Sequence, residues 1–283
     1  MKTTKIIYFL VLLFPSSTFA CINSYTMELS PEHFDSAQQR IDYYQTEFKR
    51  NKQDHTGPYT VQQKNDDAVL LILMGQYQQA ISILEALERS HPNLPKTAVN
   101  LGTAYELDGQ LLQARKWIRI GMQRDPNIHD GSEWIHMNIL NAKLNHADVK
   151  WLNQNPLLDL SFGHGYFPKP NHIHQDHIDQ MGLERIFEQA KLQIAERKQF
   201  VFGKDPILAR VYYELANIDQ SLYSESGLNR MLYNREANEL LGFAQSLGLQ
   251  KDPLIEKRIS LMSAKTWQRV WMQIHDYFSN WFS

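Results

Sequence analysis

The chain has one cysteine among its 283 residues, so it cannot form an internal disulfide. It also lacks a dominant charge, because 29 Lys and Arg against 31 Asp and Glu leave a formal net charge of −2. This balance gives no electrostatic argument for binding to nucleic acid or to an anionic membrane. With 43% apolar residues, the chain can still bury a sizeable core in one or two domains.

Catalytic motifs are missing as well. The sequence contains no Gly-x-Ser-x-Gly, no phosphate-binding loop, no dinucleotide fingerprint and no His-Glu-x-x-His. The pair Glu133-x-x-His136 occurs once, whereas a di-iron bundle needs two such pairs and further glutamates. A surface or interhelical hydrogen bond is the better interpretation of this pair. We therefore expect a protein that is not an enzyme.

The first twenty residues have the pattern of a secretory signal peptide. Lys2 and Lys5 form a basic start, and an uninterrupted apolar run follows over residues 6–14. The small residues Thr18 and Ala20 then occupy the −3 and −1 positions of a cleavage site. The run is too short for a membrane-spanning helix, which needs about 20 apolar residues. The pattern predicts export, to the periplasm of a bacterium with two membranes.

The only cysteine, Cys21, directly follows this cleavage site and has two interpretations. It can be the acylated first residue of a lipoprotein, held at a membrane by its acyl chains. Alternatively, an ordinary signal peptidase cuts after Ala20, and Cys21 has no special role. Thr18 and Phe19 depart from the usual lipobox, whereas the cysteine stands where acylation requires it. The sequence thus predicts either a periplasmic protein or a membrane-anchored lipoprotein that faces the periplasm.

An internal repeat organises the first half of the chain. The residues Gly75, Ala80, Leu84 and Pro92 recur 34 residues later as Gly109, Ala114, Ile118 and Pro126. A period of 34 residues is that of the tetratricopeptide helix–turn–helix unit. In this pattern, a glycine occupies the turn between two helices, and small residues such as Ala80 and Gly102 allow the helices to approach closely.

Residues 95–127 resemble a tetratricopeptide repeat, and residues 61–93 resemble a weaker one. The stronger match rests on Leu101-Gly102, Tyr105, Gly109, Ala114, Ile118 and Pro126. A wider resemblance, to exported bacterial tetratricopeptide proteins without an assigned activity, rests on residues 101–106 and 131–136, with Ile139-Leu140 and Ala142-Lys143. The resemblance implies right-handed stacking of helix pairs and a groove that binds a partner peptide.

We therefore predict an all-α protein with a short helix–turn–helix solenoid followed by further helices. The expected segments are a signal peptide (1–20), an N-terminal lead-in with a capping helix (21–60), repeats (61–94, 95–128 and a degenerate 129–151), a His-rich loop (152–177) and a C-terminal helical region (178–283). Expected helices include approximately 36–50, 130–143, 179–196 and 225–247. Asp205-Pro206 and Asp252-Pro253 each predict a helix start.

The concave face of the repeats is the expected binding surface for a protein or peptide partner. In the family pattern, the helix positions that face this groove are Asn65, Asp66, Val69 and Ile72 in the first unit, Lys96, Val99, Asn100, Thr103 and Glu106 in the second, and Glu133, Trp134 and Met137 in the third. The expected function is a non-catalytic interaction scaffold of the bacterial envelope. As an alternative, some of these positions are covered by the N-terminal helix or by the C-terminal half.

A His-rich stretch gives a rival function. His164, His172, His174 and His177 lie close together in the sequence, and imidazole is a common ligand of zinc and copper. The rival is a metal-binding envelope protein that uses residues 164–177. The other interpretation of this stretch is a polar, exposed loop, since a His tract is only a compositional hint.

The end of the chain is rich in aromatic residues. An apolar stripe at helical spacing consists of Trp267, Val270, Trp271, Ile274, Phe278, Trp281 and Phe282. This stripe can cap the helical core, lie on a membrane surface, or bind a partner helix. Polar residues such as Gln268, Gln273 and Asp276 interrupt it, so it is not a transmembrane span.

Overall fold

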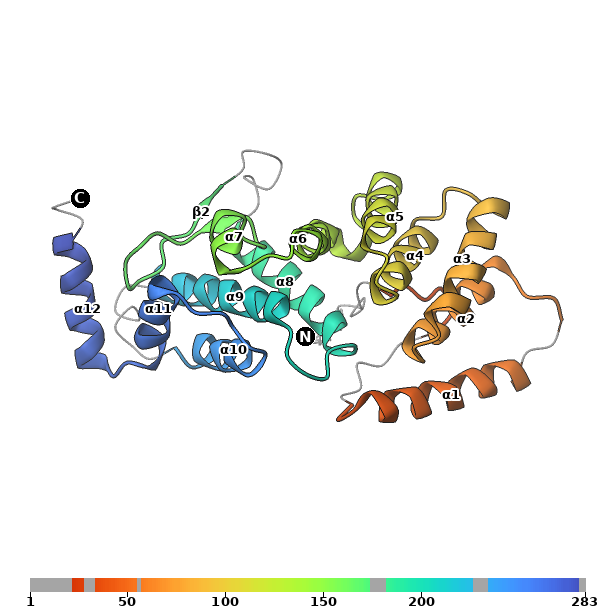
Figure 1. Ribbon diagram of the computed structural model, residues 1–283, viewed down its shortest axis with the longest axis horizontal. Coiled ribbons are helices and arrows are strands. Elements are labelled where there is room, and N and C mark those ends of the chain that lie inside the picture. The colour runs from red at the N-terminus through yellow and green to blue at the C-terminus, as the bar shows by residue number, and fades with distance from the viewer. Residues whose placement is uncertain (1–21, 28–33, 55–56, 174–181, 226–233, 280–283) are drawn as a thin grey trace, which may run out of the picture.

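The computed structural model describes residues 22–27, 34–54, 57–173, 182–225 and 234–279 (Figure 1). These residues form twelve α-helices, one 3-10 helix and one two-stranded sheet, which confirms the predicted all-α class. The signal peptide and Cys21 lie outside the described residues. The elements are α1 (Ala37–Asp54), α2 (Val61–Leu73), α3 (Tyr77–Ser90), α4 (Pro95–Leu107), α5 (Leu111–Arg124), η1 (Ile128–Gly131), α6 (Glu133–Leu144), α7 (Val149–Gln154), β1 (Leu160–Ser161), β2 (Asn171–His172), α8 (Leu183–Lys198), α9 (Pro206–Glu225), α10 (Arg235–Ser246), α11 (Pro253–Ser263) and α12 (Thr266–Ser279).

Two helix pairs, α2–α3 and α4–α5, occupy the region of the sequence repeat. Gly75 and Gly109 lie in their turns with φ of 77° and 83°, a conformation that glycine adopts without a steric penalty. Thr60 caps α2 by accepting a hydrogen bond from the Gln63 amide, while the Gln63 side chain accepts one from the Thr60 amide. The equivalent glycines therefore act at equivalent turns, as the constant spacing predicts.

Gly102 is the small contact residue between α4 and α5. A Cβ at this position would lie 2.7 Å from Ile118 Cδ1 and 3.0 Å from the Ile118 backbone nitrogen. We expect Gly102→Ala to lower the free energy of unfolding by about 1–3 kcal/mol through overpacking. Gly242→Ala is the matched control, because Gly242 is also helical and has no atom within 4 Å of such a Cβ. Chemical denaturation should show that the control stabilises the chain by about 0.5–1 kcal/mol; equal effects of both changes would contradict this packing.

The interior consists of two large clusters that meet at α6. The first cluster combines α2–α5 with Ile22, Phe34 and Tyr44. The second combines α6–α11 with residues 157–162. From α6, Leu140 joins the first cluster, while Ile135 and Ile139 join the second. The helix of the third expected repeat, α6, therefore packs against the first two repeats on one side and against the C-terminal core on the other.

The stretch 152–177 was expected as an irregular boundary, and its described part, residues 152–173, contributes to that second core. Leu157, Leu158 and Leu160 are fully buried, and Leu160–Ser161 pairs antiparallel with Asn171–His172. The Leu157 and Leu158 amides donate hydrogen bonds to the buried Glu214 carboxylate of α9. This stretch is thus packed onto α9 over much of its length and does not behave as a linker.

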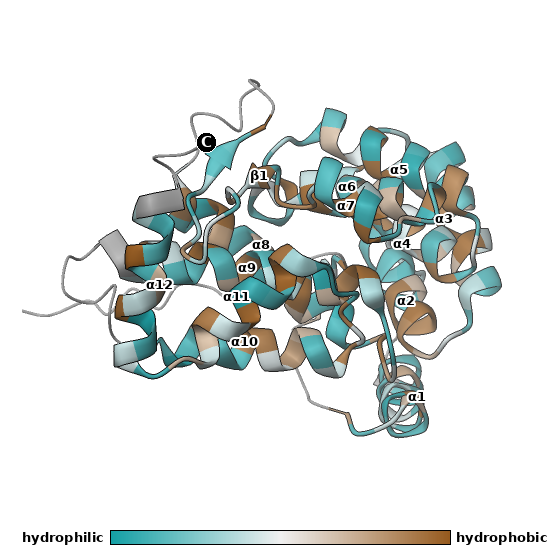
Figure 2. Cartoon of the chain, turned by 60° about the vertical axis from the view of Figure 1, so that its left-hand side comes forward, coloured by the Kyte–Doolittle hydropathy of each residue, from teal (hydrophilic) through white to brown (hydrophobic). Residues whose placement is uncertain are grey.

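Several helix boundaries differ from those predicted. The helix expected from residue 130 begins at Glu133, because His129 and Asp130 have positive φ values of 52° and 56°. The helix expected over 225–247 begins at Arg235, where the Asn234 side chain caps it; residues 226–233 lie outside the described part. The starts at Pro206 and Pro253 are confirmed, and α1 runs further than expected, to Asp54. Figure 2 shows α1 as a largely hydrophilic helix.

Candidate functional site

The concave face of α2 and α4 holds the chain's own N-terminal segment, residues 22–27. Asn100, fully buried on α4, binds both main-chain groups of Asn23: its Oδ1 accepts from the Asn23 amide at 2.7 Å, and its Nδ2 donates to the Asn23 carbonyl at 2.9 Å. Asn65 on α2 donates to the same carbonyl at 2.8 Å. The two asparagines also bond to each other. These side chains hydrogen-bond to the amide and the carbonyl of Asn23, the same main-chain groups that a neighbouring β-strand would bind.

Asp66 and Lys96 bind the next three residues of the segment. The buried Asp66 carboxylate accepts hydrogen bonds from the amides of Tyr25 and Thr26, each at 2.7 Å, and from the Thr26 hydroxyl at 2.6 Å. Lys96 donates to the Ser24 carbonyl at 2.9 Å and lies over the Tyr25 ring. Most of these contacts are again to main-chain atoms, so they depend little on the side chains of the bound segment.

Two further contacts depend on side chains of the segment, those of Ile22 and Asn23. The Ile22 side chain is 1% exposed and belongs to the first core cluster. The Asn23 side-chain amide is hydrogen-bonded to His129 Nε2. The other ring nitrogen of His129, Nδ1, faces the Glu133 carboxylate. The groove therefore contacts the side chains of an apolar residue, Ile22, and of the polar residue that follows it, Asn23.

The turn that presents His129 has an unusual backbone. His129, Asp130 and Gly131 all have positive φ, and residues such as Asp and His enter this region more readily than bulky ones. The Ser132 side chain donates to the His129 carbonyl at 2.7 Å and holds the turn. Because of this left-handed turn, α6 starts at Glu133 and not near residue 130 as expected.

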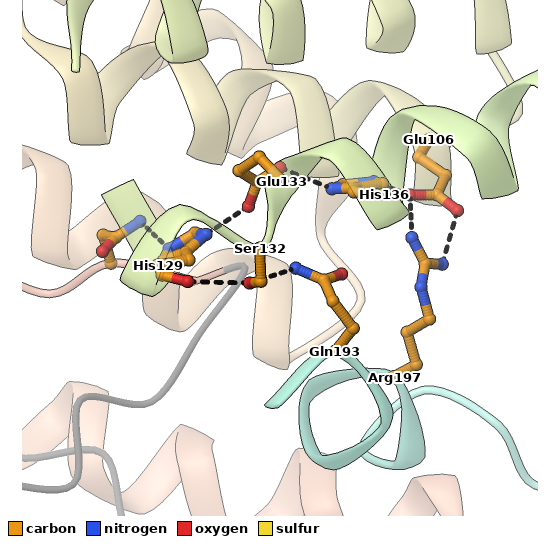
Figure 3. Close-up of polar contacts among 8 residues, drawn as sticks. Glu106, His129, Ser132, Glu133, His136, Gln193 and Arg197 are labelled. Carbon is orange, nitrogen blue, oxygen red and sulfur yellow. Dashed lines mark hydrogen bonds and ion pairs between the residues drawn. The ribbon is translucent and has the colours of Figure 1, made fainter. Parts of the chain in front are cut away.

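A row of buried charged residues continues from His129 into the molecule (Figure 3). Glu133 lies between His129 and His136, and His136 Nε2 is 2.6 Å from Glu106 on α4. Glu106 also accepts from Lys143 at 2.7 Å and from Arg197 of α8 at 2.8 Å. Of the two expected roles of Glu133-x-x-His136, a surface or an interhelical hydrogen bond, the structure has the interhelical one, which joins His136 to Glu106. The row connects α4, α6 and α8.

The surroundings lower the pKa values of Glu106 and Glu133 and raise the pKa of His136, so that each shift favours the charged form. Burial favours the neutral carboxyl of Glu133, but His129 and His136 outweigh it and hold its pKa far below the usual range. Burial acts likewise on Glu106, where Arg197 first, and then Lys143 and His136, lower the pKa. Burial lowers the pKa of His136 and Arg197 adds to this, yet Glu106 and Glu133 together raise it.

These shifts predict a mildly acidic optimum for the contribution of this row to stability. The depressed pKa values of Glu106 and Glu133 stabilise the fold above about pH 4.5, the ordinary value, and this is lost as the pH falls through the native values. The raised pKa of His136 stabilises it below about pH 6.5, and this is lost as the pH rises. Denaturation over pH should therefore show that His136→Gln costs most, about 1–3 kcal/mol, between these limits. A cost that does not vary with pH would contradict the assignment.

Helix α8 covers the part of the concave face beyond this row. Trp134 Nε1 donates to Gln189 at 2.8 Å, and Gln193 donates to the Ser132 hydroxyl at 3.0 Å. Both glutamines are buried. Beside Arg197, a cavity of about 150 Å³ is lined by Glu106, His136 and Lys143 together with Phe200 and Val201. The C-terminal half thus closes this end of the groove.

The predicted groove residues therefore have different environments. Asn65, Asp66, Lys96 and Asn100 contact residues 22–27. Val69, Ile72 and Val99 are buried in the core and do not line an open surface. Thr103 and Glu106 line the cavity, Glu133 and Trp134 face the charged row and α8, and Met137 packs against the first core. We expected an open groove that is free to bind a partner. In the structure, residues 22–27 of the same chain fill part of it.

The residues that sequence reasoning missed are Asn23, His129, Lys143 and Arg197. Asn23 lies in a polar lead-in without any periodic pattern, and its role depends on how the chain folds back onto α4. Arg197 lies 91 positions from Glu106 in the sequence. The one available signal was Glu133-x-x-His136, since a helical carboxylate–imidazole pair requires partners when it is buried.

The His-rich stretch is only partly described by the structure. His164 is exposed, and its carbonyl accepts from Lys257 at 3.1 Å. His172 is half-buried at the end of β2, while His174 and His177 lie outside the described residues. Within the described part of the chain, no group of three or more His, Cys, Asp or Glu side chains could hold a metal ion. Zinc or copper at residues 164–177 stays a prediction, which the metal content of the purified protein would test.

Comparisons with protein-family models, with curated proteins and with solved structures give no match for this chain. Among the described helices, none is long and apolar enough to cross a membrane. The functional argument therefore depends on the site itself.

Proposed function

We propose that this protein is a non-catalytic peptide-binding scaffold of the bacterial envelope. Its groove, formed by α2, α4 and the η1–α6 turn, takes an extended segment of a partner, and residues 22–27 fill it when no partner is bound. The observation that carries the proposal is the paired binding of Asn100 to the amide and the carbonyl of Asn23. Side chains that bind main-chain atoms suit peptides of differing sequence, because every residue carries the same main-chain groups.

The signal-peptide pattern and the tetratricopeptide resemblance support this proposal. Export would place the groove in the periplasm, and helix-pair repeats use concave faces to bind peptides. Cleavage after Ala20 would also leave the mature chain starting one residue before the buried Ile22. On this proposal, the segment that occupies the groove would be the N-terminus of the mature protein, whether or not Cys21 is acylated.

A binding assay with peptides in solution tests the proposal. Ile22→Asp should expel the segment, because a carboxylate would replace a buried apolar side chain. A labelled peptide with the sequence of residues 22–27 should then bind this variant. Adding Asn100→Ala to this variant should weaken peptide binding by about tenfold to a hundredfold, because buried polar groups lose their partners. Methylation of the backbone nitrogen of Asn23 in the peptide should have a similar effect for the same reason. Gln79→Ala, on the exposed side of α3, is the matched control.

The sequence tolerance of the groove decides between a scaffold and a fixed structural segment. Peptides that keep an apolar residue followed by asparagine, but differ at the later positions, should bind the Ile22→Asp chain within about tenfold of the native peptide. A groove that accepts only the native sequence, or that binds equally well after Asn100→Ala, would contradict the proposed function.

A further inference from the structure

Helix α12 is attached to the rest of the protein through its polar face. The buried Asp276 carboxylate accepts hydrogen bonds from the amides of Tyr166 and Phe167, at 2.9 and 3.0 Å. Gly165 lies against the same carboxylate, since a Cβ there would be 2.5 Å from Asp276 Oδ2. On the same face, Arg269 is fully buried and donates to the carbonyls of Met262 and Ala264.

The apolar face of α12 points outward. Trp267 is 70% exposed, Trp271 57% and Ile274 51%, and Val270 and Tyr277 are also exposed. Of the three interpretations of the stripe, the cap of the helical core does not fit its described members, because they are exposed. Met272, which is not part of the stripe, packs inward against Phe167 and Leu261. The side chains of Phe278, Trp281 and Phe282 lie outside the described part of the chain. An exposed apolar face of this kind marks an interaction surface.

The composition of this face fits a lipid surface. Tryptophan and tyrosine favour the boundary between headgroups and acyl chains, because one part of each ring is apolar and another is polar. Asp276 is the only acid between Lys265 and Tyr277, and it is buried, so this part of the helix presents no exposed carboxylate to an anionic membrane. Lys265 is exposed beside Trp267, and Lys257 lies over the ring of Tyr166, which contacts Trp271.

The position of α12 allows a flat surface to reach it. Helix α12 forms one end of the elongated molecule, and its axis runs across the long direction of the chain (Figure 1). We propose that the outward face of α12, consisting of Trp267, Val270, Trp271, Ile274 and Tyr277, docks onto the interface of a lipid bilayer. The helix lies in the plane of the membrane without crossing it, as amphipathic interfacial helices do. Apolar burial drives this binding, and the few lysines add little to it.

Quenching of tryptophan fluorescence by brominated lipids tests the proposal at α12 itself. All chains carry Cys21→Ser, so that acylation cannot contribute, and share one N-terminus. Vesicles of phosphatidylethanolamine and phosphatidylglycerol carry bromine near the headgroup. The parent chain should show quenching and co-float with the vesicles, and moderate salt should change this by less than about twofold, because screening acts only on charges. Trp267→Ser with Trp271→Ser should reduce partitioning by about tenfold or more, since both rings supply buried apolar area.

A control variant changes exposed apolar side chains outside α12. Leu112→Ser with Phe243→Ser removes two exposed apolar side chains elsewhere and should leave quenching unchanged. Circular dichroism should confirm that all variants stay folded. No quenching in the parent chain, or equal quenching in the Trp267/Trp271 variant, would overturn the proposal. A lipid-free dimer that dissociates in that variant would also overturn it, because the face would then bind a second copy.

Discussion

Replacing Glu106 with alanine is expected to lower the free energy of unfolding by about 3–5 kcal/mol. Its carboxylate is buried and accepts from His136, Lys143 and Arg197, so truncation removes the acceptor from three donors at once. Breaking a buried ion pair costs more than the pair contributes, because the remaining charge stays in a medium of low dielectric. The loss should appear as a lower denaturation midpoint.

Two further variants separate the charge of Glu106 from its packing. Glu106→Gln keeps the shape and one acceptor but removes the negative charge that interacts with Arg197, Lys143 and His136, so we expect an intermediate loss. Glu188→Ala is the control: Glu188 lies on α8 with Lys191 at 3.1 Å, but its side chain is 60% exposed, and such pairs contribute less than about 1 kcal/mol. If Glu106→Ala cost no more than this control, the charged row would not connect α4, α6 and α8 as described.

Replacing Asp66 with alanine is expected to release residues 22–27 from the groove. The carboxylate accepts from two amides and one hydroxyl of the segment, and hydrogen bonds to a charged group contribute about 1.5–3 kcal/mol each. The total loss cannot exceed the free energy that docks the segment, so we expect about 2–3 kcal/mol. Since 1.4 kcal/mol is a factor of ten, the released population should rise by roughly 30- to 150-fold.

Chymotryptic cleavage after Tyr25 measures this release in the native chain. The rate of cleavage follows the open population when opening is fast, so it should rise by the same factor. The neighbouring Asp67 provides a matched control, because it pairs with the exposed Lys52 of α1 and not with the segment. Asp67→Ala should leave cleavage after Tyr25 nearly unchanged. Equal acceleration by both variants would mean that Asp66 does not hold the segment.

The sequence predicts the first half of the fold well because its signals are local. The glycines of the repeat fix turns, Gly102 permits a close helix contact, and Asp-Pro pairs start two later helices. The start of α6 could not be predicted, because the spacing of the repeat does not reveal the left-handed turn at residues 129–131. The reversed orientation of α12 also escapes a periodicity argument, which assumes that the apolar face of a helix turns inward.

The candidate site, too, could be predicted from the sequence only in part. The family pattern places Asn65, Lys96 and Asn100 on the concave face, and they do converge there. It does not reveal that residues 22–27 fill the groove, because these residues have no periodicity and Asn23 lies 77 positions from Asn100. Nor does it reveal that α8 contributes Arg197 to Glu106. Both contacts depend on long-range packing, which single-sequence patterns do not encode.

Amide hydrogen exchange at Asn23, Tyr25 and Thr26 tests the central claim most directly, because these amides donate to Asn100 and Asp66 in the groove. In the unmodified chain near pH 6, we predict that all three exchange at least about 100-fold more slowly than in an unstructured peptide. Adding saturating competitor peptide should return them toward the unprotected rate. Exchange at the unstructured rate in the free chain would contradict the account, since residues 22–27 would then not occupy the groove.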